Sequence, residues 1–424
     1  MGRSSPCPQT ILLKSTAGPC DGTVPIKERN DMIDFEIKNA TDLIFGLDAE
    51  QKCASLIKEC GGSRVLIHHA GEPFVLPLIQ KVTDILTAGG LYCMDLGGVV
   101  PNPRIEKVQE GVALCKEHGL DFVLAVGGGS VIDSSKLISI GAGYDGDPWD
   151  YCVGRPLDHK PLPMGVISTF AGTGSETTSG LVINKESEHA KRGLEHDWVK
   201  PNFAILDPAL TLTIPPFQTA CGIADITSHL LENFFSPVEH SDLSHNLHVA
   251  ALKTVLKHGA AVMADPKNLD SRSELMILAP LSINGILKVG RYGDWGCHAM
   301  EHKMSGDWDI PHGAGLAIVT PVWMRYIYQK HLDKFISLAV EVFGLENNPA
   351  EPEKTALAGI DALEHFFYEV LKLPRKLDGL GIKDLTDEAL RVVVKKNFQY
   401  GNATIGGMEP LSEEDCFAIY KACL

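Results

Sequence analysis

Short apolar runs alternate with amphipathic stretches along the first half of the chain, from about residue 34 onward. The apolar runs predict strands at residues 65–68, 91–95, 122–126, 164–168 and 203–206. Between them, apolar side chains recur at helical spacing at residues 49–59, 74–88 and 104–118. This alternation predicts a parallel sheet with helices on its faces.

The pattern changes beyond Pro208. Long segments with helical apolar spacing continue to Leu424, and runs of β-branched residues become rare. The first 30 residues differ from both halves, because they are rich in Ser, Pro, Thr and Gly and lack apolar periodicity. We therefore expect a flexible extension at residues 1–30, an α/β domain at 31–208 and an all-helical domain at 209–424.

Charge and cysteine content limit the partners. The 424 residues include 38 basic and 54 acidic side chains, a formal net charge of −16, so nucleic acid and anionic membranes are not expected to bind. No run approaches the roughly 18–20 apolar residues that a membrane-spanning helix needs. The 11 cysteines are an odd number without a C-x-x-C pair, which favours a reducing, cytoplasmic setting.

A glycine-rich turn follows the predicted strand at 122–126. It consists of Gly127, Gly128, Gly129 and Ser130, and it opens a helix that carries Asp133. Glycines let the backbone approach a phosphate closely, and a helix N-terminus offers unpaired N–H groups with a partial positive charge. The turn therefore predicts a phosphate or pyrophosphate site, although it is not the G-x-G-x-x-G fingerprint of an ordinary Rossmann domain.

A second glycine-bearing turn follows the next predicted strand, at residues 168–176. Thr169 and Thr173 could bring hydroxyl groups from this turn to the same ligand. Ligands of open parallel sheets collect at the carboxyl ends of the strands, so two such turns strengthen the case for a bound nucleotide.

Possible metal ligands cluster in the second half. Asp225 and His229 lie four residues apart, which puts both side chains on one helix face, and His298 and His302 repeat that spacing before His312. One carboxylate with three imidazoles suits iron or zinc rather than magnesium or calcium. A continuous helix would separate His298 from His312 by about 21 Å, so the chain must turn back between them.

Together these motifs resemble the iron-containing, or group III, alcohol dehydrogenases. The resemblance rests on four runs: residues 127–136, residues 173–176, residues 222–229 and the stretch from 293 to 313. It extends from about Met32 to the C-terminus, and within the family the chain looks most like the bacterial NADPH-dependent butanol dehydrogenase and aldehyde reductase branch.

The resemblance implies a dehydroquinate synthase-like fold, in which a dinucleotide-binding α/β domain precedes an all-α domain and the site lies in the cleft between them. It implies that the metal ligands are Asp225, His229, His298 and His312. His302 matches a histidine near the metal and the nicotinamide, with an expected catalytic role. The positions expected to hold the cofactor are Gly128, Gly129, Ser130, Thr169 and Thr173, and Lys191 matches a lysine near the adenosine ribose.

The choice of cofactor depends on the end of the first predicted strand. In NAD-specific members of the family an aspartate stands about where Ala70 falls, and it repels a 2′-phosphate. Ala70 removes that repulsion. Lys191 and either His68 or His69 are expected to attract the 2′-phosphate by their positive charge, whereas the carboxylate of Glu72 is expected to repel it. We therefore expect NADP(H) to be favoured over NAD(H).

The resemblance implies hydride transfer between NADP(H) and a small primary alcohol or aldehyde such as butanol or butanal. Fe²⁺ is the expected ion, with Zn²⁺ as the alternative, and a homodimer is the expected assembly. A same-fold enzyme of the dehydroquinate synthase or glycerol-1-phosphate dehydrogenase type remains a second candidate, but it would need a basic pocket, and no dense Lys/Arg cluster surrounds the ligand segments. A third candidate binds metal and nucleotide without turnover.

Overall fold

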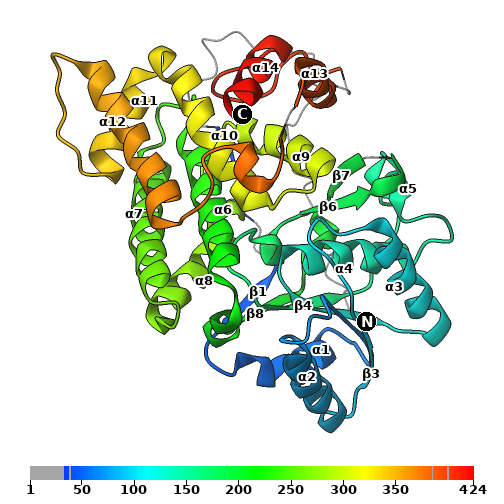
Figure 1. Ribbon diagram of the computed structural model, residues 1–424. Coiled ribbons are helices and arrows are strands. Elements are labelled where there is room, and N and C mark those ends of the chain that lie inside the picture. Colours follow the sequence, from blue (N-terminus) through cyan, green and yellow to red (C-terminus); the bar gives the residue numbers. More distant parts are fainter. Residues whose placement is uncertain (1–32, 38–39, 189, 384, 399–400) are drawn as a thin grey trace, which may run out of the picture.

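The fold is described from a computed structural model, which covers residues 33–37, 40–188, 190–383, 385–398 and 401–424. The extension expected at residues 1–30 lies outside this part of the chain. A sheet with its helices forms one half of the molecule and a helical array forms the other (Figure 1).

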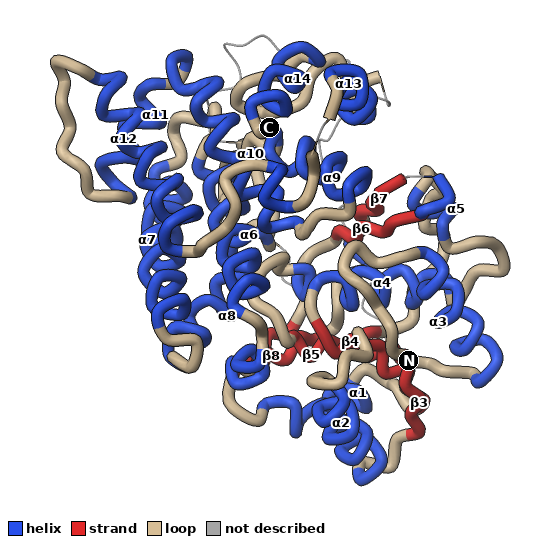
Figure 2. Tube along the Cα trace, viewed as in Figure 1, coloured by secondary structure: helices blue, strands red, loops and turns tan. Residues whose placement is uncertain are grey.

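A six-stranded parallel sheet organises the first half, in the order β1-β8-β5-β4-β2-β3. Its strands are β1 (Asp42–Phe45), β2 (Arg64–His69), β3 (Tyr92–Leu96), β4 (Phe122–Gly127), β5 (Met164–Ser168) and β8 (Phe203–Leu206). The five strands that the sequence predicts are confirmed, and β1 at the sheet edge is the one that it misses. Figure 2 shows the strands of this sheet side by side.

Alternate side chains of the strands enter different cores on the two faces of the sheet. Val123 and Ala125 of β4 pack with α3 (Ile105–His118) and α4 (Gly129–Gly141), whereas Phe122 and Leu124 pack with α1 (Cys53–Glu59) and α2 (Leu76–Ala88). This split follows from the two-residue repeat of a strand. The sheet is therefore buried on both faces, as its near-continuous apolar strands require.

An antiparallel hairpin that the sequence does not predict packs against α3 and α4. It pairs β6 (Gly180–Lys185) with β7 (Ala190–Glu195). Shorter helices in this half are η2 (Ala49–Lys52), α5 (Trp149–Cys152), η3 (Ser175–Thr177), η4 (Glu186–Glu188) and η5 (Asp197–Val199).

The change from sheet to helices comes at η6 (Pro208–Thr213), where the sequence pattern changes. The helices beyond it are α6 (Pro216–Phe234), α7 (Asp242–Ala264), α8 (Leu269–Ile283), α9 (Gly296–Trp308), α10 (His312–Ile327), α11 (Leu332–Ser337), α12 (Pro352–His365), α13 (Asp387–Lys396) and α14 (Glu413–Ala422). Shorter turns are η7 (Tyr328–Lys330), η8 (Leu338–Val342), η9 (Phe366–Val370) and η10 (Leu377–Leu380). The predicted helical second half is confirmed.

One apolar core joins these helices, and α6 runs through it with every residue from 219 to 234 buried. A helix buried on all sides places its polar side chains inside the protein, so each of them needs a partner. Among the described residues no helix is both long and apolar enough to cross a membrane.

Candidate metal and coenzyme site

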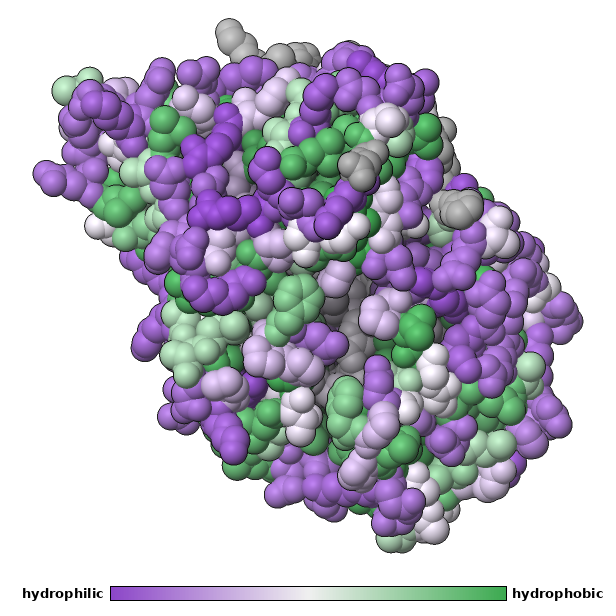
Figure 3. Space-filling view, in the orientation of Figure 1, coloured by the Kyte–Doolittle hydropathy of each residue, from purple (hydrophilic) through white to green (hydrophobic). Residues whose placement is uncertain are grey.

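A cleft of about 1220 Å³ lies between the two halves. Its walls include the start of α4, the hairpin β6-β7, the middle of α6, the first half of α9 and the first residue of α10. Figure 3 shows the surface hollowed between the halves. A large concave site of this kind is where a ligand is expected to bind.

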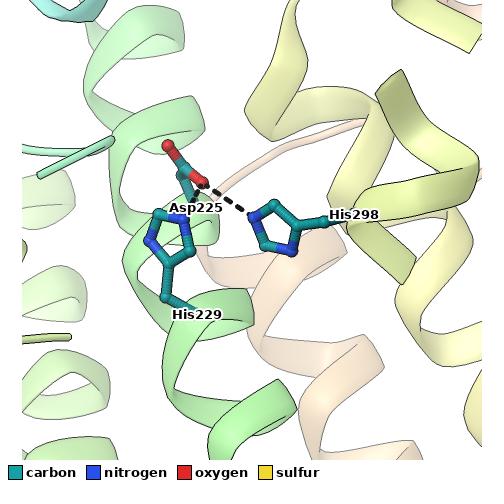
Figure 4. Close-up of side chains that lie close together, drawn as sticks. All are labelled: Asp225, His229 and His298. Atoms are coloured by element: carbon teal, nitrogen blue, oxygen red, sulfur yellow. Dashed lines mark ion pairs between the residues drawn. The ribbon is translucent and has the colours of Figure 1, made fainter. Parts of the chain in front are cut away.

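Three of the four predicted metal ligands meet deep in this cleft (Figure 4). Asp225 and His229 come from α6 and His298 comes from α9. The Oδ1 atom of Asp225 lies 3.5 Å from Nε2 of His229 and 3.7 Å from Nε2 of His298. Two ligands held tetrahedrally at 2.0–2.2 Å from an ion lie roughly 3.3–3.6 Å apart, so this spacing fits one shared ion.

His312 approaches the same carboxylate from the first residue of α10. Its Nε2 lies 3.6 Å from Oδ1 of Asp225. The chain turns back between α9 and α10 as expected, through Asp309 in a left-handed conformation (φ 51°) and Pro311 at the helix N-cap. Asp225, His229 and His298 offer ligand atoms that all lie within 4.8 Å of one another, whereas His312 is not within that distance of all three.

The buried polar atoms of this cluster support a bound cation. Oδ1 of Asp225 and Nε2 of His298 are buried and have no hydrogen-bond partner among the described residues. Buried polar atoms in native proteins are nearly always paired, so two unpaired atoms that face each other indicate a missing ligand. The donor set of one carboxylate oxygen and imidazole nitrogens matches iron or zinc.

Two buried glutamates orient the imidazoles from behind. Glu232 accepts a hydrogen bond from the His298 backbone N–H at 3.0 Å, and its other oxygen lies 2.5 Å from Nδ1 of His298. Glu301 bonds in the same way to Nδ1 of His312. A carboxylate behind a histidine fixes its ring with Nε2 toward the metal.

Neither glutamate belongs to the site residues expected from the sequence, although a signal exists. Glu232 follows Asp225 by seven residues, which is two helical turns on the same face of α6, and Glu301 follows His298 by three.

The predicted ligands differ in how readily they bind a cation: His229 and Asp225 offer free lone pairs, whereas His298 carries a proton that a bound ion must displace. Burial lowers the pKa of His229 to about 3, which leaves its ring neutral with a free lone pair. Burial also acts to lower the pKa of His298, but Glu232 and Asp225 outweigh it and raise that pKa to about 10. Burial raises the pKa of Asp225, yet the three neighbouring imidazoles outweigh it and hold the group ionised.

Two glycines allow the site helices to approach closely. A Cβ on Gly313, next to His312, would stand 2.0 Å from the carbonyl oxygen of Cys221 on α6. A Cβ on Gly222 would stand 2.1 Å from the carbonyl oxygen of Ala171, which belongs to the second glycine-bearing turn. Only glycine fits at both positions, so these contacts hold α10 and the turn against α6.

His302 lies beside the metal cluster and lines the cleft. Its ring centroid is 5.2 Å from that of His312 and 6.1 Å from that of His298. Burial holds the pKa of His302 well below its usual value, so the ring is neutral.

The predicted cofactor residues divide into two groups. Those that line the cleft are Gly129, Ser130, Asp133, Thr173 and Lys191, whereas Ala70, Gly127, Gly128 and Thr169 are not among its lining residues. Helix α4 begins at Gly129, with Gly128 as its N-cap. The cleft therefore contains the N-terminus of α4, where unpaired N–H groups attract an anion.

The glycines of the first turn are also needed for packing. A Cβ on Gly127 would stand 2.5 Å from Val131, and one on Gly128 would stand 3.0 Å from Phe170. A Cβ on Gly129 would stand 2.6 Å from the hydroxyl of Thr173. The two glycine-bearing turns therefore lie in contact, as their positions at neighbouring strand ends predict.

Asp133 is occupied by neighbouring protein groups. Its Oδ1 accepts a hydrogen bond from the hydroxyl of Ser175 at 2.5 Å, and its Oδ2 accepts one from the backbone N–H of Val182 at 2.9 Å. These bonds join α4 to the second turn and to β6. The carboxylate thus supports this side of the cleft, and direct contact with the cofactor remains a prediction.

Lys191 lies at the metal end of the cleft. Its Nζ donates to Asn102 at 3.0 Å and to the hydroxyl of Ser305 at 2.6 Å, and Ser305 donates to Glu301. Three hydrogen bonds therefore link Lys191 to His312 through Ser305 and Glu301. This placement favours a role beside the metal rather than at the adenosine ribose.

The expectation that His68 helps to bind a 2′-phosphate is wrong. His68 is fully buried, with Nδ1 on the Leu96 carbonyl and Nε2 on Ser134, and burial lowers its pKa to about 3. His69 is 2% exposed and does not line the cleft. Both rings support the sheet because they belong to β2 itself rather than to the loop after it.

The cleft is more basic than the sequence indicates. Among the described residues, six cationic side chains line it, namely Arg155, Lys191, Arg192, Lys200, Lys288 and Lys303. They come from separated segments, so no dense cluster is visible along the chain.

Comparison with known proteins assigns the family. Residues 40–208 match the model described as iron-containing alcohol dehydrogenase, and residues 219–424 match the C-terminal model of the Fe-containing alcohol dehydrogenase family. The chain is 37% identical to NADH-dependent butanol dehydrogenase A of Clostridium acetobutylicum over 391 residues, which is 92% of this chain and 99% of that protein. It is 29% identical to the NADPH-dependent aldehyde reductase YqhD of Escherichia coli, over 92% of this chain and 100% of that one.

A solved structure extends the likeness to the fold. The crystal structure of NADH-dependent butanol dehydrogenase A from Thermotoga maritima matches with a TM-score of 0.87 and 33% identity, and covers 93% of this chain and 100% of that one. The names of these relatives include both NADH and NADPH, so the expected preference for NADP(H) is not confirmed. The expected family is confirmed: this chain is an enzyme that belongs to the iron-containing alcohol dehydrogenases.

Proposed function

We propose that the protein reduces a small aldehyde with NAD(P)H, and oxidises the alcohol in reverse, at one divalent ion held by Asp225, His229, His298 and His312. The observation that carries the proposal is that three imidazole nitrogens converge on one carboxylate oxygen at 3.5–3.7 Å. Fe²⁺ is the proposed ion, with Zn²⁺ as the alternative.

The reaction consumes one aldehyde, one NAD(P)H and one proton, and it forms one alcohol and one NAD(P)⁺. When bound, the ion supplies Lewis acidity toward the carbonyl oxygen and the nicotinamide supplies the hydride. The single carboxylate of Asp225 leaves the site with a net positive charge, which favours negative charge that develops on the carbonyl oxygen. Glu232 and Glu301 keep the imidazoles aligned and limit reorganisation during the reaction.

His302 is the proposed source of the proton. Its neutral ring lies beside His298 and His312 and faces the cleft, so it can pass a proton toward the product oxygen without competing for the ion. His302→Ala should retain metal and lose roughly 10²-fold or more in kcat, the usual scale of general acid–base help. Unchanged turnover across the pH range would remove this role.

The N-terminus of α4 is the proposed pyrophosphate site, with Gly129, Ser130 and Thr173 beside it. We further propose that NADP(H) is favoured over NAD(H), because Ala70, the residue directly after β2, carries no charge that would repel a 2′-phosphate. Ala70→Asp should then shift the ratio of kcat/KM for NADPH over NADH toward NADH by tenfold or more. A parent enzyme that favours NADH would contradict the preference.

A homodimer is the proposed assembly. Ile33, Phe35 and Ile37 alternate with acidic residues and are 41%, 55% and 49% exposed. An exposed apolar row of this kind is suited to contact with a second copy of the chain. Sedimentation of the parent and of Phe35→Ser checks this, and a monomeric parent would contradict it.

The proposed function is tested by following NADPH and NADH oxidation with butanal. The protein is stripped of metal and reloaded anaerobically with Fe²⁺ or Zn²⁺. We expect no turnover without metal, recovery with one of the two ions at one equivalent per chain, and no recovery in Asp225→Asn. Full turnover of the stripped protein would contradict the proposal.

A further inference from the structure

We propose that the natural substrate is an aldehyde with an anionic group, such as a carboxylate, at the end remote from the carbonyl, and that Lys288 and Lys303 recognise this group. The inference rests on the proposed function, because it places the carbonyl at the metal cluster. It specifies the substrate class, which neither the family nor the relatives' names fix.

The charge balance of the cleft is the first support. Its lining includes the six cations named above against three carboxylates, Asp133, Glu195 and Asp225, a formal excess of three positive charges. The whole chain carries a formal net charge of −16. A positive cleft in a strongly negative protein concentrates anionic ligands.

Some of these cations already pair with other residues of the chain. Arg155 pairs with Asp158 at 2.9 Å, and Lys200 pairs with Asp197 at 2.8 Å. Lys191 donates to Asn102 and Ser305. Lys288 and Lys303 differ, because neither ammonium group makes an ion pair or a hydrogen bond with any other residue that the structure describes.

Lys288 lies close to the metal cluster. Its Nζ is 6.0 Å from the ring centroid of Trp295, and that ring is 5.3 Å from the His298 ring and 6.1 Å from the His229 ring. The first two of these distances set an upper limit of about 11 Å between the ammonium group of Lys288 and the centre of the His298 ring. Glu195 is the carboxylate that most influences Lys288, but it lies beyond ion-pair distance.

Lys303 directly follows His302 on α9 and also lines the cleft. It is half-buried, and burial together with Arg192, Lys191 and Lys396 lowers its pKa, with Asp307 as the opposing carboxylate. Asp307 is already engaged by Lys396. Lys303 therefore lies in a region of repelling positive charges.

Such unpaired, partly buried cations are costly unless an anion joins them. The pyrophosphate of a coenzyme has the N-terminus of α4 on the opposite wall, whereas Lys288 and Lys303 come from the helical half with the metal ligands. A four-carbon aldehyde with a terminal carboxylate spans roughly 6 Å from oxygen to carboxylate. With the carbonyl at the metal, the carboxylate would extend into the cleft, where Lys288 lies within about 11 Å of the His298 ring and Lys303 lines the same cavity.

The test compares two aldehydes of equal length, butanal and 4-oxobutanoate, which has a carboxylate in place of the terminal methyl group. The quantity measured is the ratio of kcat/KM for 4-oxobutanoate over butanal in the metal-loaded parent, Lys288→Met, Lys303→Met and Lys58→Met. Lys58→Met is the control, because Lys58 is exposed on α1 and its removal changes the net charge equally. Equilibrium binding of 4-hydroxybutanoate and of 1-butanol provides a second readout.

We expect the parent ratio to exceed ten, to fall at least tenfold in both cleft variants, and to stay within twofold in Lys58→Met. Lys288→Arg should restore much of the ratio, and 4-hydroxybutanoate should bind more tightly than 1-butanol only where both lysines are present.

A parent that prefers butanal overturns the inference and leaves the proposed function intact. Cleft variants that raise the coenzyme KM and affect both aldehydes equally also overturn it, since the lysines would then serve the coenzyme phosphates. No turnover of either aldehyde would instead contradict the proposed function.

Discussion

The proposed coenzyme wall, built by β4, its turn, α4 and the turn after β5, pairs its buried side chains within the protein, whereas the metal wall of α6, α9 and α10 does not. On the coenzyme wall the fully buried Lys136 donates to the hydroxyls of Ser175 and Thr178 and to the carbonyls of Thr178 and Gly180. On the metal wall Asp225 and His298 keep buried atoms without partners. The polar groups of the first wall are paired within the protein, whereas the unpaired atoms of the second are the ones that the proposed ion would bind.

The two walls also differ in how the chain builds them. The coenzyme wall comes from consecutive pieces, namely β4, its turn and α4, together with the turn after β5. The metal wall joins three helices, and His298 follows His229 by 69 positions in the chain. An ion bound there crosslinks α6, α9 and α10, so metal removal should loosen the helical half and leave the sheet half intact.

The largest expected effect is the loss of a metal ligand. Asp225→Asn removes the only charged ligand and should lower kcat/KM by about 10³-fold or more, because Lewis-acid help is worth several kcal/mol. Metal content per chain after dialysis should fall in parallel. His365→Ala, an exposed histidine of α12, is the control and should keep both. A variant that retains full metal and activity would show that the ion lies elsewhere.

The next effect concerns a buried charge of the coenzyme wall. Burial raises the pKa of Glu176, which is 2% exposed, from 4.5 to about 7. The folded state therefore binds this proton more tightly than the unfolded chain, and stability is lost as the pH rises from 4.5 through 7. The loss amounts to about 3 kcal/mol. Above pH 7 Glu176→Gln should exceed the parent in free energy of unfolding by up to that amount, and by little at pH 4.5.

Chemical denaturation of both proteins across this pH range measures the difference. A constant difference between parent and variant would show that Glu176 is already ionised when buried, paired with Lys136. Metal content should not change, because Glu176 lies on the coenzyme wall and is not one of the proposed metal ligands.

A smaller effect is expected behind the metal ligands. Glu232→Gln keeps the shape of the side chain but weakens its hold on His298, and should lower metal affinity by about 10- to 100-fold. Glu301→Gln should do the same through His312. Competition with a chelator of known affinity measures both. Unchanged affinity would mean that the helices alone orient the rings.

The smallest effect is expected at the first glycine of α4. Gly129→Ala adds a Cβ that would stand 2.6 Å from the hydroxyl of Thr173, so the two turns must separate slightly. The coenzyme KM should rise about tenfold, equivalent to about 1.4 kcal/mol, with metal content unchanged. Lys58→Ala, on the exposed face of α1 and outside the cleft, is the control and should leave the coenzyme KM near the parent value.

Sequence reasoning predicted the elements whose signals are local. The buried strands are continuous apolar runs, and Asp225 with His229 and His298 with His302 share helical spacing. Strand β1 was missed because it has only four residues and is partly exposed, and β6-β7 because its second strand, AKRGLE, carries mixed polar side chains.

Features that depend on long-range packing were not predictable in the same way. Glu232 and Glu301 matter only because α6, α9 and α10 converge. The basic cleft draws Arg155, Lys200 and Lys288 from segments that are far apart in sequence, so their charges combine only in the fold.

The central claim is that Asp225, His229, His298 and His312 hold one divalent ion. Anomalous diffraction from crystals of the iron- or zinc-loaded protein tests it most directly. The account predicts one peak per chain, within 2.0–2.2 Å of Oδ1 of Asp225 and of the three Nε2 atoms. A peak at another acidic group, such as Asp48, Glu50 and Asp207 beside Lys81, or no peak in an active protein, would contradict it.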